Sequence, residues 1–316
     1  MLTLFTTAKA FAGHSGVIQR NALQSWKLLH HDVEVILFGS DEGAAEVCTQ
    51  YGIRHEPHVE RNEHGTKRLD YIFCRAQEIA CHDVLCYANC DIILMADFCR
   101  ALERVKAVLP RFLMVGRRWD TSITEAVDFS APNWEKQLQA KALAANDQKP
   151  PYYIDYFAFR RGLYRDKIPP LVIGRVHWDN WLIWYARDQG VTVIDASEMV
   201  LAVHQNHDYS YHAKGKDGVW NDEQAQRNLQ LAGGRSHVLT ITDADKILAL
   251  DGLKSNPKRH WIGFKRRFLQ SKDSIVFSVW HPMWFVFLGI TRPLRSALGL
   301  RSGLFRRLRT RWRTNV

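Results

Sequence analysis

Short, largely apolar runs alternate with segments of helical periodicity over residues 1–116. Between the runs, apolar residues recur every three or four positions, which is typical of helices that bury one face. Continuous apolar strands suit a sheet that is covered on both sides, so the alternation predicts an α/β fold with a mostly parallel central sheet and helices on both faces. The apolar runs are LTLFTT, VEVILF, DVLCYANCD and RFLMVG.

Polar side chains follow several of these runs. In parallel sheets, ligands gather at the carboxyl ends of the strands, which is where Thr6, Thr7, Asp41, Asn89 and Asp91 are expected. Carboxylate and amide oxygens suit Mg²⁺ or Mn²⁺, and a cation held there neutralises a diphosphate leaving group. The alternative is that the pattern N-x-D only begins a turn, which is common after a strand.

The chain continues less regularly after residue 116. Residues 119–151 are more polar and are interpreted as an insertion beside the site, with a helix over 134–145. Further strands and a helix are expected in the apolar segments that follow, and Asp155 is expected within the first strand. These segments are YYIDYFAFRRGLY, HWDNWLIWYARDQG, VTVID and LAVHQNHDYSYH.

The positive charge is confined to the end of the chain. The formal net charge is +10, but residues 258–313 hold 14 Lys and Arg and one acid, so the first 257 residues carry 29 bases and 32 acids. We therefore expect two parts, a catalytic body over 1–256 and a basic tail over 257–316. The six cysteines lack paired C-x-x-C spacing and no secretory signal opens the sequence, so a cytoplasmic protein with reduced thiols is expected.

The tail carries an uncharged, aromatic-rich stretch, SIVFSVWHPMWFVFLGI, at residues 274–290. This is shorter than the roughly 20 apolar residues that a spanning helix needs. Basic segments on both sides favour a helical tail that lies at an anionic membrane surface, because Trp and Phe settle at the headgroup boundary and Arg pairs with lipid phosphate. The prediction is peripheral attachment to the inner face of the membrane. The alternative is a pair of helices packed on the body.

The strand-end motif NCD and its surroundings resemble the GT-A fold glycosyltransferases, the nucleotide-diphospho-sugar transferase superfamily, over residues 2–250. In that family a D-x-D motif holds the metal of the sugar nucleotide. Here Asn89 replaces the first acid, and its amide is expected to ligate the metal or to bind the ribose. The resemblance implies Mn²⁺ or Mg²⁺ bound by Asp91 and by His204, with His207 as the alternative imidazole.

The resemblance also implies a nucleotide site at the first two strands. Thr6 and Thr7 correspond to residues that line the base, and Asp41 to an acid near the base or ribose. Lys67 and Arg68 are expected to contact the ribose or diphosphate, Arg68 being preferred because a planar guanidinium suits phosphate. The alternatives are a helix cap at Asp41 and a solvated helical turn at 67–68.

Asp155 is a candidate for the sugar site. It lies in an apolar aromatic segment, where an unpaired carboxylate is costly, so it needs either sugar hydroxyls or a partner within the protein. Arg160 and Arg161 are the candidate partners.

Asp179 in VHWDNW is the candidate catalytic base. The resemblance implies an acid in this region that deprotonates the acceptor hydroxyl or orients the sugar. Trp178 and Trp181 are expected to be stacking surfaces. The alternative makes Asp179 a helix cap and Trp181 part of the core.

These residues together predict a hexosyltransferase that uses a nucleotide-diphosphate sugar, in particular a UDP-sugar, and a glycan or lipid-linked acceptor in cell-surface polysaccharide or glycolipid assembly. A sugar-nucleotidyltransferase is less favoured because TTAKAFAGHSG has few glycines to cradle a triphosphate. A non-catalytic nucleotide-sugar binding protein is the other alternative. Nucleic-acid binding is not expected, since only the tail is basic and no recognition motif is present.

Overall fold

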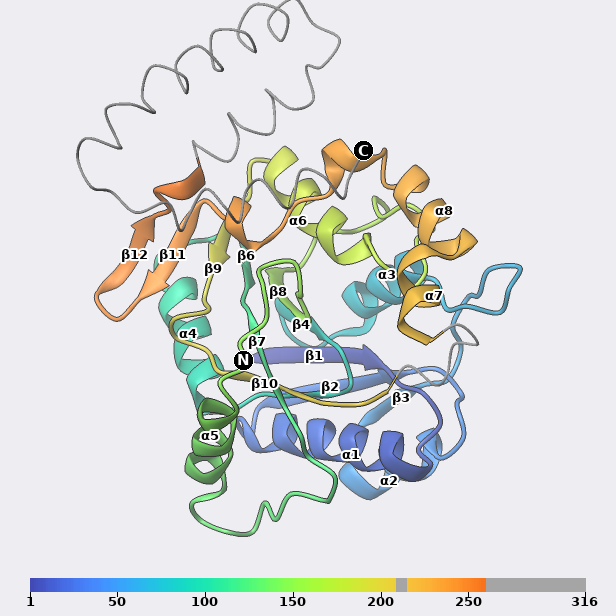
Figure 1. The fold of residues 1–316 in the computed structure, drawn as a ribbon, viewed down its shortest axis with the longest axis vertical. Helices are drawn as coiled ribbons and strands as arrows, with labels where there is room; N and C mark the ends of the chain where they lie inside the picture. Colours follow the sequence, from blue (N-terminus) through green and yellow to red (C-terminus); the bar gives the residue numbers. More distant parts are fainter. Residues whose placement is uncertain (209–214, 260–316) are drawn as a thin grey trace, which may run out of the picture. The chain divides into compact units, whose positions relative to one another are not determined.

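The structure, a computed structural model, describes residues 1–208 and 215–259. In these residues a nine-stranded sheet runs in the order β12-β11-β9-β6-β8-β4-β1-β2-β3 (Figure 1). The strands are β1 (Leu2–Thr7), β2 (Val33–Phe38), β3 (Arg54–Glu56), β4 (Val84–Ala88), β6 (Phe112–Val115), β8 (Tyr156–Arg160), β9 (Thr192–Asp195), β11 (Lys246–Ala249) and β12 (Gly252–Ser255).

Most neighbouring strands of this sheet are parallel. The exceptions are β8, which runs antiparallel to both β4 and β6, and the β11–β12 hairpin. The strands β1, β2, β3 and β4 are parallel in series, so their carboxyl ends meet at one edge. The prediction of a mostly parallel sheet is therefore confirmed.

Helices cover both faces of the large sheet. The helices are α1 (Gly13–Leu28), α2 (Ala44–Tyr51), α3 (Leu69–Ile79), α4 (Ala96–Lys106), α5 (Trp134–Ala145), α6 (Trp178–Asp188), α7 (Gly215–Asn221) and α8 (Glu223–Leu231). One apolar core joins α1, α2 and α4 to the sheet, and a second joins α3 and α6 to its other face. Each fully buried large side chain, such as Trp26 or Phe73, contributes about 1.5–3 kcal/mol through removal of apolar surface from water.

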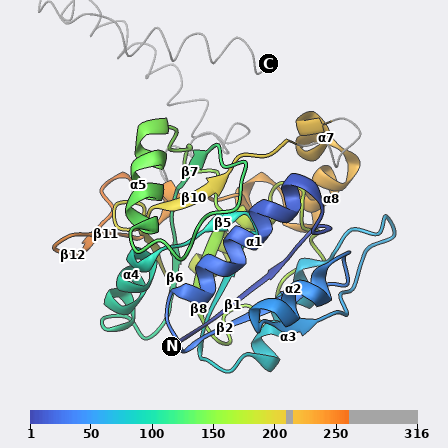
Figure 2. The same cartoon turned by 90° about the horizontal axis from the view of Figure 1, so that it is seen from below.

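A second, three-stranded sheet was not predicted from the sequence. It has the order β5-β10-β7 and consists of β5 (Ile92–Ile93), β7 (Arg118–Thr121) and β10 (Ala202–Gln205). Figure 2 shows α5 beside this small sheet, and side chains of α5 share its apolar core. β7 belongs to the polar segment 119–151 that the sequence indicated to be an insertion.

The sequence misplaced Asp155 within its strand. Asp155 comes directly before β8. Because β8 is antiparallel to β4, with Tyr156 opposite Ala88, the start of β8 lies at the carboxyl end of β4. Asp155 thus reaches the predicted edge of the sheet because β8 is antiparallel to β4; in a parallel strand a residue before the first position would lie at the opposite edge.

The part of the chain described by the structure ends close to the predicted boundary between body and tail. Asn256 is buried and donates hydrogen bonds to the carbonyls of Thr242 and Ala244, and Arg259 lies 3.1 Å from Asp245. The predicted membrane-associating tail lies outside the described residues, apart from 257–259. Within residues 1–208 and 215–259, each helix is too short or too polar to cross a bilayer.

Candidate active site

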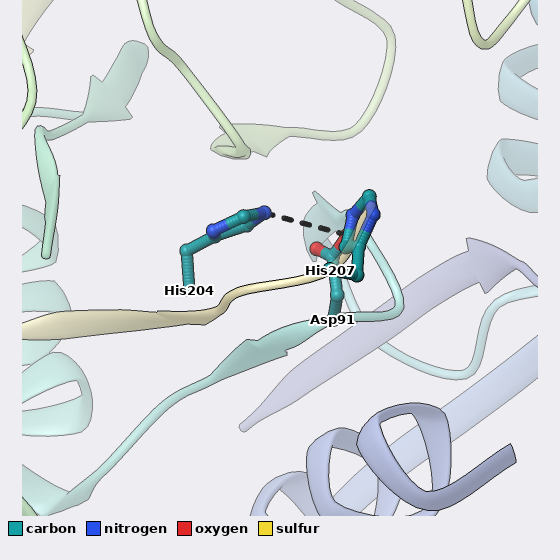
Figure 3. A group of neighbouring side chains, drawn as sticks. All are labelled: Asp91, His204 and His207. Atoms are coloured by element: carbon teal, nitrogen blue, oxygen red, sulfur yellow. Dashed lines mark hydrogen bonds and ion pairs between the residues drawn. The ribbon is translucent and has the colours of Figure 1, made fainter. Parts of the chain in front are cut away.

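Asp91, His204 and His207 converge beyond the carboxyl end of β4. Each offers one ligand atom, and these atoms all lie within 4.8 Å of one another. Nε2 of His207 is 3.1 Å, and Nε2 of His204 is 3.7 Å, from Oδ2 of Asp91. Figure 3 shows both imidazoles beside the carboxylate. We call these three residues the Asp-His-His cluster.

The small sheet brings the three residues together although more than 100 positions separate Asp91 from the two histidines. β5 follows Asp91 directly and pairs antiparallel with β10, so that Ile92 lies opposite His204. Gln205 donates two hydrogen bonds to the Asp91 carbonyl, from its backbone and from its side chain. Trp26 of α1 donates to the Ile92 carbonyl at 2.9 Å, which ties this turn to the first helix.

The electrostatics favour an ionised carboxylate at Asp91. Burial alone raises its pKa, but the charge of His204 and the hydrogen bond from His207 lower the pKa well below its usual range. The same hydrogen bond raises the pKa of His207 against the effect of burial. The cluster therefore places one negative charge between two nitrogen ligands.

The cluster fits a divalent metal. In the described residues, Oδ1 of Asp91 is buried and has no hydrogen-bond partner. Ligand atoms that are adjacent on an ion lie roughly 3 Å apart when the bonds are about 2.1 Å. The pair His207–Asp91 matches this at 3.1 Å, whereas His204 lies 3.7 Å from Asp91, so the ligands would draw together on an ion. Two imidazoles with one carboxylate favour Mn²⁺ over Mg²⁺.

Two further residues of this site, Arg118 and Asp120, were not predicted. Both lie on β7, where Asp120 is directly opposite His204. Oδ1 of Asp120 is 3.2 Å from Nδ1 of His204 and accepts a hydrogen bond from Nε of Arg118 at 2.8 Å. Burial raises the pKa of Asp120, but His204 and Arg118 outweigh it and lower that pKa to about 2. The polar alternation R-W-D-T was the only sequence signal for this strand.

Arg118 is also the partner of Asp155. Its Nη1 lies 3.1 and 3.0 Å from the two carboxylate oxygens of Asp155, and the predicted partners Arg160 and Arg161 are therefore wrong. Nδ2 of Asn89 donates to Asp155 at 2.7 Å, so the nitrogen of its amide faces this pair. The desolvation of these buried charges is offset by their mutual hydrogen bonds.

Asp179 is half-buried at the start of α6, and its Oδ1 atom is inaccessible to solvent. Burial, together with the nearby charge of Asp155, raises its pKa from 3.8 to about 7, although backbone N–H groups of the helix start lower it. The helix cap is His177, which adopts a left-handed φ of 83°, and Asp179 is the second helical residue. Among the described residues Oδ1 of Asp179 has no hydrogen-bond partner, so a half-buried carboxyl with a near-neutral pKa is available.

The predicted nucleotide residues form a second polar group at the ends of β1 and β2. Nζ of Lys67 donates to Thr7 Oγ1 at 2.8 Å, to the carbonyl of Ala8 at 2.6 Å and to Asp41. Burial lowers the pKa of Lys67, and Asp41 acts in the opposite direction. Gly39 has a φ of 106°, and a Cβ there would lie 2.8 Å from the Asp41 carboxylate. Thr6 is buried beside this group.

Arg68 is not brought to that group. It is paired with Glu60 at 2.6 Å and with Asp70, and it lines a cavity of about 350 Å³ that also contains Arg61 and Arg227. Lys67 and Arg68 therefore contact different surroundings. Lys9, which was not predicted, lies near Asp91: burial lowers its pKa, and the charges of Asp91 and Asp208 raise it.

The two predicted stacking residues are in the core. Trp178 and Trp181 are buried in the apolar layer of α6, where Trp178 makes an edge contact with Tyr87. The expectation that they form stacking surfaces is wrong, and the alternative reading of Trp181 as core is confirmed. A cavity of about 410 Å³ lies beside the Asp-His-His cluster and is lined by Ala12, His14, Ser15, Asn206, His207 and Asp208.

No protein-family model matches this sequence, and no curated protein matches it. The fold is similar to glucosyl-3-phosphoglycerate synthase from Mycobacterium tuberculosis in complex with Mn²⁺, UDP-glucose and phosphoglyceric acid, with 13% identity and a TM-score of 0.44 over 74% of this chain and 80% of that chain. It is also similar to the mannosyltransferase PcManGT from Pyrobaculum calidifontis with GDP-Man and Mn²⁺, with 13% identity and a TM-score of 0.41 over 67% of this chain and 59% of that chain. Because identity and TM-score are low, the function proposed below depends on the side chains of this chain.

Proposed function

We propose that this protein is a metal-assisted glycosyltransferase of the GT-A type, which transfers a sugar from a nucleotide-diphosphate sugar to an acceptor hydroxyl. The observation that carries the proposal is the Asp-His-His cluster at the carboxyl edge of a mostly parallel sheet. A half-buried, ionised Asp91 with an unsatisfied, inaccessible oxygen suits a divalent ion, and strand ends of such a sheet suit a nucleotide. UDP is the proposed nucleotide.

The residues take separate roles in this reaction. Asp91, His204 and His207 hold the ion, which, when bound, supplies positive charge against the departing diphosphate. Lys9 adds a cation next to Asp91. The group of Thr6, Thr7, Asp41 and Lys67 lines the nucleotide side, and the 410 Å³ cavity beside His207 is large enough for part of such a ligand.

The proton of the acceptor hydroxyl needs a base. Asp179 is the proposed one, because its pKa of about 7 lets it be ionised and still accept a proton near neutral pH. Asp155 is tied to Arg118 and Asn89, so we assign it the role of orienting polar groups rather than of moving a proton.

The proposal extends to the setting of the reaction. The basic, aromatic tail supports peripheral attachment to the inner face of the membrane from the cytoplasm, where glycan or lipid-linked acceptors of cell-surface polysaccharide are assembled. This part rests on the sequence alone.

A thermal-shift screen of UDP- and GDP-sugars with and without Mn²⁺ tests the function. A ligand that binds only the folded state at about 100 times its Kd raises the melting temperature by about 5 to 10 °C for a domain of this size. We expect such a shift to require Mn²⁺ and to disappear in Asp91→Ala.

The matched control is Asp251→Ala, because Asp251 is an exposed carboxylate in the β11–β12 hairpin. This variant is expected to retain the full shift. A metal-dependent shift that survives in Asp91→Ala contradicts the metal assignment. Release of pyrophosphate instead of nucleoside diphosphate during turnover would favour the nucleotidyltransferase alternative.

A further inference from the structure

Three partly exposed aromatic rings lie together next to the buried network of the site, the two tyrosine rings tilted by 35° and the Trp220 ring edge-on to both. The ring centroids of Tyr152 and Tyr153 are 4.8 Å apart, and that of Trp220 lies 6.4 and 6.0 Å from them. Tyr152 is 45% exposed, whereas Tyr153 and Trp220 are half-buried. We call these three residues the aromatic platform.

The aromatic platform is joined to the Asp-His-His cluster through one side chain. The guanidinium carbon of Arg118 lies 4.8 Å from the centre of the Tyr153 ring. The same guanidinium contacts Asp155 and Asp120, and Asp120 lies 3.2 Å from His204. A chain of contacts through Arg118 and Asp120 therefore links the platform to the metal ligand His204.

The charges around the platform do not favour an anionic ligand, because the cations there are already paired. Arg118 is neutralised by two carboxylates, and Nζ of Lys149 lies 2.7 Å from Asp147 and 3.4 Å from Asp120. Arg117 donates to the carbonyls of Gln148 and Lys149, so each of these three cations already has a partner within the described chain and none is left for a phosphate or carboxylate. Carboxylate oxygens do, however, accept hydrogen bonds from hydroxyl groups.

A pyranose ring has the matching chemistry. One of its faces presents C–H groups, which pack on an aromatic ring, while its edges carry hydroxyl groups that need acceptors. Tyr and Trp offer a flat apolar surface together with a polar group at the rim. Trp178 and Trp181 are buried in the core, so they offer no such surface.

We propose that Tyr152, Tyr153 and Trp220 bind the acceptor of the reaction, and that this acceptor is an uncharged sugar ring rather than a small phosphorylated acid. The role of the bound sugar as acceptor rests on the proposed glycosyl transfer. The binding itself is a property of the platform and is measurable without turnover.

Saturation-transfer NMR on the full-length protein tests it, with methyl β-D-glucopyranoside, methyl β-D-galactopyranoside and methyl α-D-mannopyranoside as probes and 3-phosphoglycerate as the anionic comparison. We expect saturable binding of at least one pyranoside and none of 3-phosphoglycerate at the platform. Tyr152→Ala is expected to weaken the pyranoside by about tenfold, and Tyr152→Phe to keep the affinity because it retains the ring.

The matched control is Leu143→Ala, since Leu143 is a similarly exposed apolar side chain on α5, at 53%. The proposal is overturned if no pyranoside binds, if Tyr152→Ala binds it as tightly as the parent protein, or if 3-phosphoglycerate is preferred. It is also overturned if Tyr152→Ala loses affinity for UDP, because the rings then hold the nucleobase.

Failure of the proposed function is distinguishable from these results. That function fails if Mn²⁺-dependent donor binding is absent or does not depend on Asp91. Pyranoside binding to the aromatic platform is measured independently of this, with the methyl pyranosides and the Tyr152 variants.

Discussion

Replacement of Asp120 by asparagine tests whether the second sheet orients the metal ligand His204. Oδ1 of Asp120 lies 3.2 Å from Nδ1 of His204 without forming a hydrogen bond, so its negative charge favours the tautomer with the proton on Nδ1, which leaves the lone pair on Nε2 for the ion. Asparagine keeps the shape of the side chain and removes its charge. We expect Asp120→Asn to fold and to bind Mn²⁺ less tightly.

The size of the effect follows from the geometry. Two full charges 3.2 Å apart interact by about 5 kcal/mol at an effective dielectric constant of about 20, which sets an upper bound. A metal-bound imidazole is neutral and carries only part of a charge at its N–H, so the loss is smaller. Outer partners of metal-bound histidines typically contribute about 10- to 100-fold in affinity, or about 1.4–2.7 kcal/mol.

The substitution also affects the fold, because Asp120 accepts a buried hydrogen bond from Arg118. Hydrogen bonds to charged groups contribute about 1.5–3 kcal/mol to the free energy of unfolding. Arg118 keeps its contacts with Asp155, so the variant remains paired at that position. Urea unfolding measures this cost separately from metal binding.

Titration with Mn²⁺, followed by the electron paramagnetic resonance signal of the free ion, measures the affinity directly. Asp195→Asn is the matched control, because Asp195 is a half-buried aspartate that ends β9 and accepts a hydrogen bond from Ser197. It is expected to bind Mn²⁺ normally. Wild-type affinity in Asp120→Asn, alongside its loss in Asp91→Ala, would refute the orienting role of Asp120.

Two further predictions concern the base and the tail. Asp179→Asn is expected to reduce the transfer rate by about 10²- to 10⁴-fold, and the wild-type rate is expected to rise with pH through about 7 as the carboxyl ionises. Between pH 3.8 and about 7 the folded protein holds a proton on Asp179 that the unfolded chain has lost. The free energy of unfolding therefore falls as pH rises across this window, by roughly 4 kcal/mol at most. Asp179→Asn should remove that fall and have a higher melting temperature than wild type at pH 8. A chain ending at residue 259 is expected to keep Mn²⁺-dependent donor binding and to lose sedimentation with phosphatidylglycerol-containing vesicles, which the full chain should show over pure phosphatidylcholine vesicles.

Opposite results would be decisive for both. If Asp179→Asn transfers sugar at the wild-type rate, or if its stability changes with pH as that of the wild type does, Asp179 is a structural residue of the helix start and not the base. Loss of donor binding in the shortened chain would show that the tail contributes to the fold of the body. Equal sedimentation of the full chain with both kinds of vesicle would contradict the membrane prediction.

The sheet and the outer parts of the site could be predicted from local patterns. Apolar runs such as Val33–Phe38 and the helical periodicity around Trp26 report how each segment is buried, and burial of both faces leads to a parallel sheet. A carboxylate after the strand ending at Ala88 was therefore expected at the ligand-binding edge. His204 was the predicted imidazole ligand with His207 as the alternative, and the structure brings both beside Asp91.

The interior of the site depended on contacts between distant segments. β7 is a short polar strand that is buried only because β10 pairs with it, so its own sequence carries no sign that Arg118 and Asp120 face the site. The direction of β8 decides that Asp155 meets Asn89 and Arg118. The periodicity of apolar residues shows which face of a segment is buried, but it does not show which other strands or helices pack against that segment.

For this chain, the order of apolar and polar residues by itself determined a doubly covered, mostly parallel sheet and the strand end that carries Asp91. Tertiary structure alone decided which charges share that edge and which aromatic rings remain exposed, such as Tyr152 instead of Trp178. The physical reason is that hydrophobic burial is already expressed in the spacing of residues along one segment. Pairing of buried charges depends on which segments the sheet order places side by side.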